Sequence, residues 1–140
     1  MNSAAQSQML LIGRVLLGLL FLVAGIRKIM FYSGSVAYFT KLGFPAPEVM
    51  GVLAILIELG GGALLVLGWQ TRRISWLLML FVVIATAMAH RFWEFDAAQY
   101  ANQMNHFLKN AAIVGGLLYV AVLGAGRLSL DGRSGGAVTS

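Results

Sequence analysis

The sequence predicts an all-α fold, a bundle of four transmembrane helices. Of its 140 residues, 59% are hydrophobic and only 11% are charged, and the mean hydropathy is +0.83. Soluble domains carry about 25% charged residues, so the composition excludes an ordinary water-soluble protein. Four apolar segments also come close to the roughly 20 residues that cross a bilayer as a helix. These segments are residues 9–31, 49–68, 74–89 and 107–123.

The first apolar segment is expected to stay in the protein as a helix and not to be a cleaved secretory signal. The leader MNSAAQSQ contains no Lys or Arg, the apolar stretch is longer than that of a typical signal, and no small-residue cleavage site follows. We therefore predict a short N-terminal tail over residues 1–8 and a four-span membrane domain over residues 9–124. The Gly- and Ser-rich residues 125–140 are predicted to be a flexible tail.

The connections between spans follow from the even number of spans, which places both termini on one side of the membrane, here called side A. The short connection 69–73 also lies on side A, and the longer connections 32–48 and 91–105 lie on the opposite side B. Pro47 suits the first turn of the second span, where its missing N–H costs nothing. Asp96 is a candidate N-cap for a helical part of the second long connection.

The net charge of +5 reflects basic residues at the span ends, where Lys and Arg anchor helices, and we predict no nucleic-acid partner. A plain count of Lys and Arg slightly favours a cytoplasmic side B. If Lys28 and Lys109 face the bundle and are left out, the count favours a cytoplasmic side A instead. We therefore expect cytoplasmic termini. The absence of cysteine excludes disulfides, thiolate metal sites and iron–sulfur clusters in this chain, and we predict no metal site.

The stretch AILIELGGGALLVLG, residues 54–68, places Glu58 near the middle of the second span. An ionisable group at that depth is costly and usually faces a partner or a wet cavity. Arg14, about one turn inside the first span, is the predicted partner, because the two helices run antiparallel. The pair could be a structural lock between two helices or part of a chemical site, and the sequence leaves both open.

Polar and small residues share one face in each of the first two spans. The face in the first span contains Arg14, Gly18, Phe21, Gly25 and Lys28, at the spacing of helical neighbours. The glycines suggest close helix packing, and Lys28 is expected to point inward, although a lysine at a span end can also extend to the membrane surface. The face in the second span contains Gly51, Ala54, Glu58, Gly61 and Leu65.

Two histidines lie near side B. His90 ends the third span, on the face that carries Met79 and Thr86, and His106 begins the fourth. Such a pair could ligate a haem or simply lie at the membrane interface, but we favour His90 as a proton carrier near neutral pH. Lys109 and Asn110 follow one turn after His106 and supply donors for a carbonyl or anionic group.

Together these positions predict a polar pocket that opens to side B. Glu58 would form its floor with Arg14 behind it, and its rim would be formed by Lys28, His90, Lys109 and Asn110. Nearby aromatic residues would flank the mouth or form an ordinary interfacial belt; they are Phe31, Tyr32, Phe92, Trp93 and Phe95. Apolar walls with a few convergent polar groups suit a small amphipathic ligand.

Several motifs occur in an order typical of one family. They are GRVLLGLLFLVAGIRKI in the first span, GFPAPEV before IELGGGALLVLGWQTR, then AHRFW, FLKNAAIVGGLL and LSLD. Each motif alone is weak, but their order and spacing together resemble the DoxX family of small four-helix membrane proteins. The resemblance covers residues 11–131. The residues that match the family's pattern are Arg14, Lys28, Glu58, His90, Lys109 and Asn110.

The resemblance implies a multi-pass protein of the bacterial inner membrane. Members of the family are described as subunits or relatives of a thiosulfate:quinone oxidoreductase and as factors in quinone or oxidative stress. Our first hypothesis is therefore a quinone-linked oxidoreductase subunit, in which Glu58 and His90 are the predicted catalytic residues and a quinone is the expected ligand, although no motif encodes a cofactor. The ligand-binding residues would be Arg14, Lys28, Lys109 and Asn110.

Electrons would have to come from a redox partner protein or a reduced substrate. The expected partners are therefore the lipid bilayer, such a redox protein and a second copy of the chain in a homo-oligomer. The alternative is a non-catalytic membrane protein, namely a scaffold, an assembly or stress-protection factor, or a carrier of small metabolites. In that alternative the Arg14–Glu58 pair would serve only as a lock.

Overall fold

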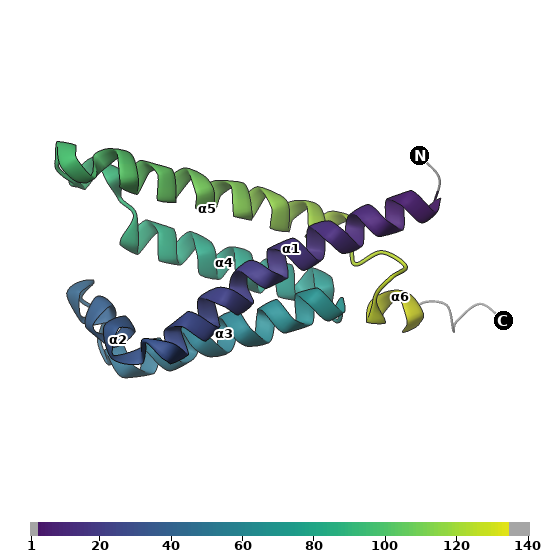
Figure 1. Cartoon of the computed structure of the whole chain (residues 1–140), viewed down its shortest axis with the longest axis horizontal. Coiled ribbons are helices and arrows are strands. Elements are labelled where there is room, and N and C mark those ends of the chain that lie inside the picture. The colour runs from purple at the N-terminus through teal and green to yellow at the C-terminus, as the bar shows by residue number, and fades with distance from the viewer. Residues whose placement is uncertain (1–2, 135–140) are drawn as a thin grey trace.

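The computed structural model describes residues 3–134 and confirms the predicted all-α fold with four long helices (Figure 1). Each long helix is long and apolar enough to cross a membrane. They are α1 (Ser3–Met30), α3 (Pro47–Leu67), α4 (Thr71–Ala89) and α5 (Ala97–Leu123). Three short helices lie at the ends of the bundle: α2 (Tyr32–Lys41), η1 (Phe92–Glu94) and α6 (Leu130–Ser134).

Each long helix begins before the corresponding predicted span does. The fourth span begins at Ala97 and not near residue 107, because Asp96 caps it by accepting a hydrogen bond from the Gln99 amide. This confirms Asp96 as an N-cap, and Pro47 lies in the first turn of α3 as predicted. Part of the first long connection is helical, since residues 32–41 form α2.

Helices α1 and α3 cross in close contact through glycines. A Cβ atom added to Gly18 would lie 2.9 Å from the carbonyl oxygen of Gly62, and one added to Gly62 would lie 2.9 Å from that of Gly18. A Cβ atom at Gly25 would lie 2.7 Å from Cγ of Leu59. The predicted packing role of these glycines is thus confirmed, because any larger residue would push the two backbones apart.

The apolar core joins all four long helices in the part of the bundle nearer side A. Its buried members are Phe21, Leu65, Leu78, Met79, Val82, Ile113, Leu117 and Ala121. Helix α3 ends at Leu67 and is capped by Gly68, whose φ of 69° lets the chain turn into α4. From this turn α3 and α4 diverge toward side B, where α2 lies at the open end (Figure 1).

Residues 125–134, which the sequence predicts as part of a flexible tail, are packed against the bundle; residues 135–140 lie outside the described residues. The Asp131 carboxylate accepts hydrogen bonds from the amides of Gln70 (2.8 Å) and Thr71 (2.9 Å) at the start of α4. The Asp131 amide donates to the carbonyl oxygen of Gly68 at 2.9 Å. The amides of Gln70 and Thr71 have no acceptor within their own helix, and Asp131 therefore caps α4 from a distant part of the chain.

Arg14 holds the same segment from the other side. Its side chain is buried and donates hydrogen bonds to the carbonyl oxygens of Ala125, Leu128 (2.9 Å) and Val66 (3.3 Å). The predicted Arg14–Glu58 pair is therefore wrong. The guanidinium points toward side A because carbonyl groups in the last turn of α3 and in the chain after α5 lack helical partners there, and its five donors match several acceptors at once.

We expect Arg14→Met to destabilise the protein by about 3 kcal/mol, because buried carbonyl groups lose their donors. Thermal denaturation of the purified protein measures the loss. Trypsin cleavage after Arg127 should accelerate at the same time, because residues 125–134 are released. The control is Arg73→Met, which removes an exposed cation from the same side. An unchanged melting temperature for Arg14→Met would contradict this role.

The cap formed by Asp131 should make stability depend on pH. Burial raises the pKa of the Asp131 carboxyl, but hydrogen bonds from Thr71 and Gln70 and the charge of Arg14 outweigh burial, so the pKa lies below its ordinary value of 3.8. A lowered folded-state pKa contributes stability that is present at neutral pH and is lost as the pH falls below about 4. Asp131→Ala should cost about 1 kcal/mol at neutral pH. Melting temperatures of the two proteins should converge at acidic pH, and a constant difference would contradict the mechanism.

Candidate ligand-binding site in the membrane

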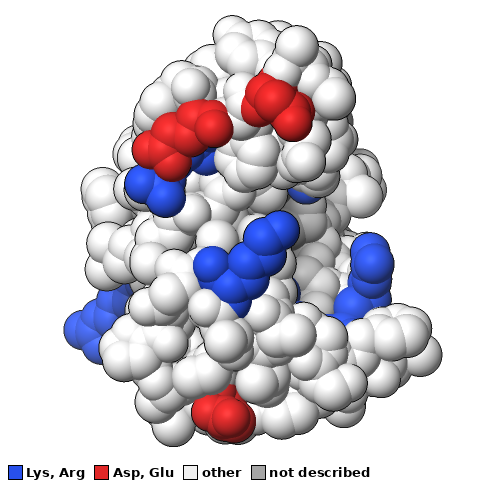
Figure 2. Space-filling view, turned by 90° about the vertical axis from the view of Figure 1, so that its left-hand side faces the viewer, with Lys and Arg blue, Asp and Glu red and all other residues white. Residues whose placement is uncertain are grey.

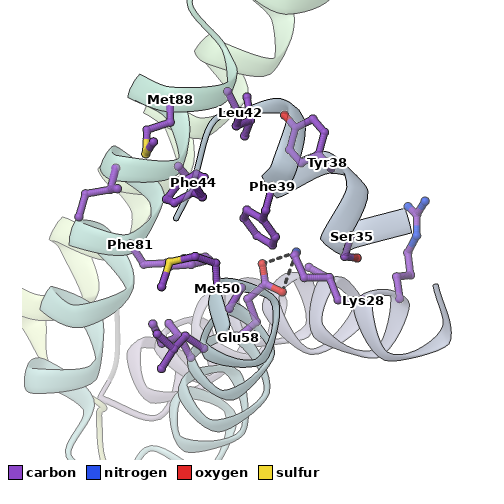
Figure 3. A pocket seen from close by; sticks show the side chains of 18 of the residues that line it. Lys28, Ser35, Tyr38, Phe39, Leu42, Phe44, Met50, Glu58, Phe81 and Met88 are labelled. Atoms are coloured by element: carbon purple, nitrogen blue, oxygen red, sulfur yellow. Dashed lines mark hydrogen bonds and ion pairs between the residues drawn. The ribbon is translucent and has the colours of Figure 1, made fainter. Parts of the chain in front are cut away.

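A cavity of about 660 Å³ lies in the half of the bundle nearer side B, between α1, α2, α3 and α4. It forms where α3 and α4 diverge, and its volume is in the range of roughly 300–1,000 Å³ typical of small-molecule sites. Its polar side chains are few. Lys28 and Glu58 lie at its floor (Figure 3). The other polar side chains that line it are Arg27, Ser35, Tyr38 and His90.

Lys28 and Glu58 form an ion pair that connects α1 to α3. The ammonium nitrogen lies 2.7 Å from Oε1 and 2.8 Å from Oε2 of the carboxylate, so it donates to both oxygens. The Glu58 side chain is 7% exposed and that of Lys28 is 27% exposed. The inward orientation predicted for Lys28 is confirmed, and Glu58 has a cationic partner in the first span, although not the one predicted.

The walls of the cavity are aromatic and aliphatic. Helix α2 contributes Tyr38 and Phe39, the following loop contributes Phe44, and α4 contributes Phe81 and Met88 (Figure 3). The rings of Phe39 and Phe44 meet edge to face at 5.5 Å. The Tyr38 phenol is only partly buried, and this partial burial raises its pKa above the ordinary value. The wall therefore offers apolar surface and ring faces to a ligand.

His90 lies at the side B end of the cavity, where α4 ends. Its Nδ1 atom is 2.8 Å from Oε1 of Gln103. The imidazole of His106 stacks on that of His90 with ring centroids 4.9 Å apart and planes 17° apart. The two rings thus face one another flat and do not direct nitrogen atoms at a common point, which argues against the alternative in which the pair ligates a haem iron.

The structure does not place three of the predicted ligand-binding residues at the cavity. Arg14 binds carbonyl groups near side A, as described above. Nζ of Lys109 lies 3.3 Å from Nδ1 of His106 on α5, and the amide of Asn110 donates to Oγ1 of Thr86 at 2.8 Å, between α4 and α5. The predicted common pocket therefore brings together Lys28, Glu58 and His90 only.

The aromatic residues that were predicted to flank the mouth of the pocket do not all lie at the cavity. Phe31 lines the cavity. Tyr32 donates to the carbonyl oxygen of Glu48 and packs near Gly51. Phe92 and Trp93 instead pack edge to face against aromatic residues of α5 outside the cavity, Phe107 among them.

Sequence reasoning missed the contribution of α2, because residues 32–48 read as a loop rich in small and aromatic residues. A helical signal was nevertheless present in that segment. Ser35, Tyr38, Phe39 and Leu42 occupy positions i, i+3, i+4 and i+7, which is the spacing of one helical face, and all line the cavity.

Comparison with known proteins agrees with this architecture. The DoxX family profile matches residues 9–91. Inner membrane protein YphA of Escherichia coli is 33% identical over 130 residues, 93% of each chain. Inner membrane protein YqjF of the same organism is 34% identical over 121 residues, 86% of this chain and 88% of the relative.

A more distant relative is the ER-derived vesicles protein ERV29 of Saccharomyces cerevisiae. It is 25% identical over 130 residues, which are 93% of this chain but 35% of the relative. No solved structure matches the chain significantly. With a family match over more than half of its length, two inner-membrane relatives and four helices able to span a bilayer, the chain is a multi-pass protein of the inner membrane and belongs to the DoxX family.

Proposed function

We propose that this DoxX-family protein is the membrane subunit of a quinone-linked oxidoreductase and binds a quinone in the cavity between α1, α2, α3 and α4. The observation that carries the proposal is the Lys28–Glu58 ion pair at the floor of an otherwise apolar cavity. An apolar pocket with a few fixed polar groups is the usual form of a site for a small amphipathic molecule.

The residues that line the cavity fit a quinone in two ways. Phe39, Phe44 and Phe81 offer ring faces and edges to a flat aromatic molecule. The Lys28 ammonium has three protons, so it can donate to a ligand oxygen while it still contacts Glu58. His90 lies at the other end of the cavity and can hold a second oxygen.

Quinone reduction consumes two electrons and two protons, and we assign the supply of the protons to residues of this chain. Glu58 can accept or release a proton at its carboxylate, and Lys28 keeps that carboxylate stable in its ionised form. His90 connects the cavity to the side B end of α4. The chain has no cysteine, and we assign electron supply to a partner protein or a reduced substrate.

The first test measures thermal stability of the purified protein with and without a short-chain quinone. A ligand that binds only the folded state raises apparent stability by about 2.7 kcal/mol at a concentration 100 times its Kd. We expect a rise for the wild type and a loss of that rise for His90→Ala. Lys109→Ala is the matched control, because Lys109 lies outside the cavity lining and should leave the effect unchanged.

A second set of variants separates ligand binding from a purely structural lock. Lys28→Met leaves the Glu58 carboxylate buried without its partner and should cost up to about 3 kcal/mol. The double variant Lys28→Met/Glu58→Gln removes both charges and should recover much of that stability. We expect the double variant to remain insensitive to quinone. A wild type that shows no rise at saturating quinone would favour the non-catalytic scaffold or carrier, with the ion pair as its lock.

A further inference from the structure

The cavity reaches the surface of the bundle through apolar side chains of the membrane-spanning helices. Leu53 of α3 and Ile84 of α4 both line the cavity, yet they are 44% and 49% exposed. Tyr38 of α2 also lines it and is 44% exposed. Side chains that border the cavity and keep this much accessible surface indicate that the cavity wall is open there.

This opening lies at the depth of lipid chains. Leu53 is six residues after the first residue of α3, or about 9 Å along the helix. Ile84 is five residues before the last residue of α4, or about 7.5 Å from its end. Glu58 lies deeper, about 16 Å along α3, which is close to the middle of a hydrocarbon core about 30 Å thick.

The other route out of the cavity leads to the side B end and is polar. Arg27 and His90 line that part of the cavity. Figure 2 shows this end of the molecule, with Lys and Arg side chains across its middle beside a recess and with Asp and Glu nearer its upper and lower edges. A hydrocarbon chain that left by this route would lie among charged groups and water, whereas one that left between α3 and α4 would remain in an apolar environment.

We propose that the cavity takes an amphiphile with one apolar tail: a compact polar head contacts Lys28 and Glu58, and the tail leaves between Leu53 and Ile84 into the bilayer. This inference rests on the proposed function for the identity of the head and adds the class of ligand and its route. The ligand enters and leaves sideways from the lipid phase, and α2 forms the roof of that route on the side B face.

The test uses the full-length protein in nanodiscs and compares Kd values from thermal shifts for two probes. One is a methyl-substituted benzoquinone and the other is the same benzoquinone with a decyl chain. Ile84→Trp fills the opening, whereas Leu80→Trp, one turn away, adds the same side chain at a position that is 59% exposed and does not line the cavity. Partition of the decyl chain into lipid is the same for every variant. The ratio of variant to wild-type Kd therefore measures only the change in binding to the cavity.

We expect Ile84→Trp to weaken the decyl probe by about tenfold or more, as overpacking does, and to leave the methyl probe unchanged. Leu80→Trp should affect neither probe. Leu53→Trp approaches the same opening from α3 and serves as a second variant if Ile84→Trp lowers the melting temperature of the free protein. Equal binding of the decyl probe to all variants would overturn the lateral route.

A second pair of probes keeps this inference separate from the quinone proposal. Methyl- and decyl-substituted para-dimethoxybenzene resemble the two benzoquinone probes in outline. They carry methyl ethers in place of the carbonyl groups and cannot be reduced as quinones are. If neither quinone binds while the decyl dimethoxybenzene is weakened selectively by Ile84→Trp, the tailed-ligand inference stands and the quinone function falls. If both quinones bind every variant alike, the quinone function stands and the lateral route falls. If no decyl probe binds at all, the inference is overturned.

Discussion

A carboxylate near the middle of a membrane-spanning helix requires a cation beside it, and the contact between Glu58 and Lys28 meets that requirement. Removing a charge from water costs several kcal/mol even after relaxation, so neither residue is stable there alone. The pair constrains the crossing of α1 and α3, since the Lys28 ammonium must reach both carboxylate oxygens. The glycine contacts at Gly18 and Gly25 let the two helices approach closely enough for this.

The cavity follows from the same arrangement. Side chains fill the bundle nearer side A, where α3 and α4 are joined by a short turn, and Arg14 and Asp131 fix the chain beyond α5 beneath that turn. Toward side B, α3 and α4 diverge and the ion pair remains at the base of the space between them. The tight end thus holds together the two helices, α3 and α4, that flank the open end.

Much of this could be predicted from the sequence, because helical periodicity alone determines which residues share a face. The stripes through Gly18, Gly25 and Lys28 in α1 and through Glu58 in α3 are buried or inward as expected. The partner of Glu58 could not be predicted this way. Arg14 and Lys28 lie on the same face of α1, and the choice between them depends on carbonyl groups at helix ends that no side-chain pattern reveals.

The remaining differences have a similar origin. Lys109 and Asn110 lie near side B as expected, but α5 turns them toward His106 and Thr86 and away from the cavity. Such rotations depend on how helices pack, and one turn of sequence cannot specify them. Helix α2 was missed because a short helix at a membrane surface is stabilised by its contacts with α3 and α1, and its own sequence is a weak signal.

Isotope-edited infrared difference spectroscopy of Glu58 in membranes, with Glu58→Gln as the reference, shows whether the ion pair is part of a ligand site. We expect an ionised carboxylate band in the free protein, because Lys28 donates to both oxygens, and a clear perturbation of that band when quinone is added. A carboxylate band that saturating quinone leaves unchanged would show that the ion pair is no part of a ligand site. A protonated Glu58 in the free protein would contradict the ion pair itself.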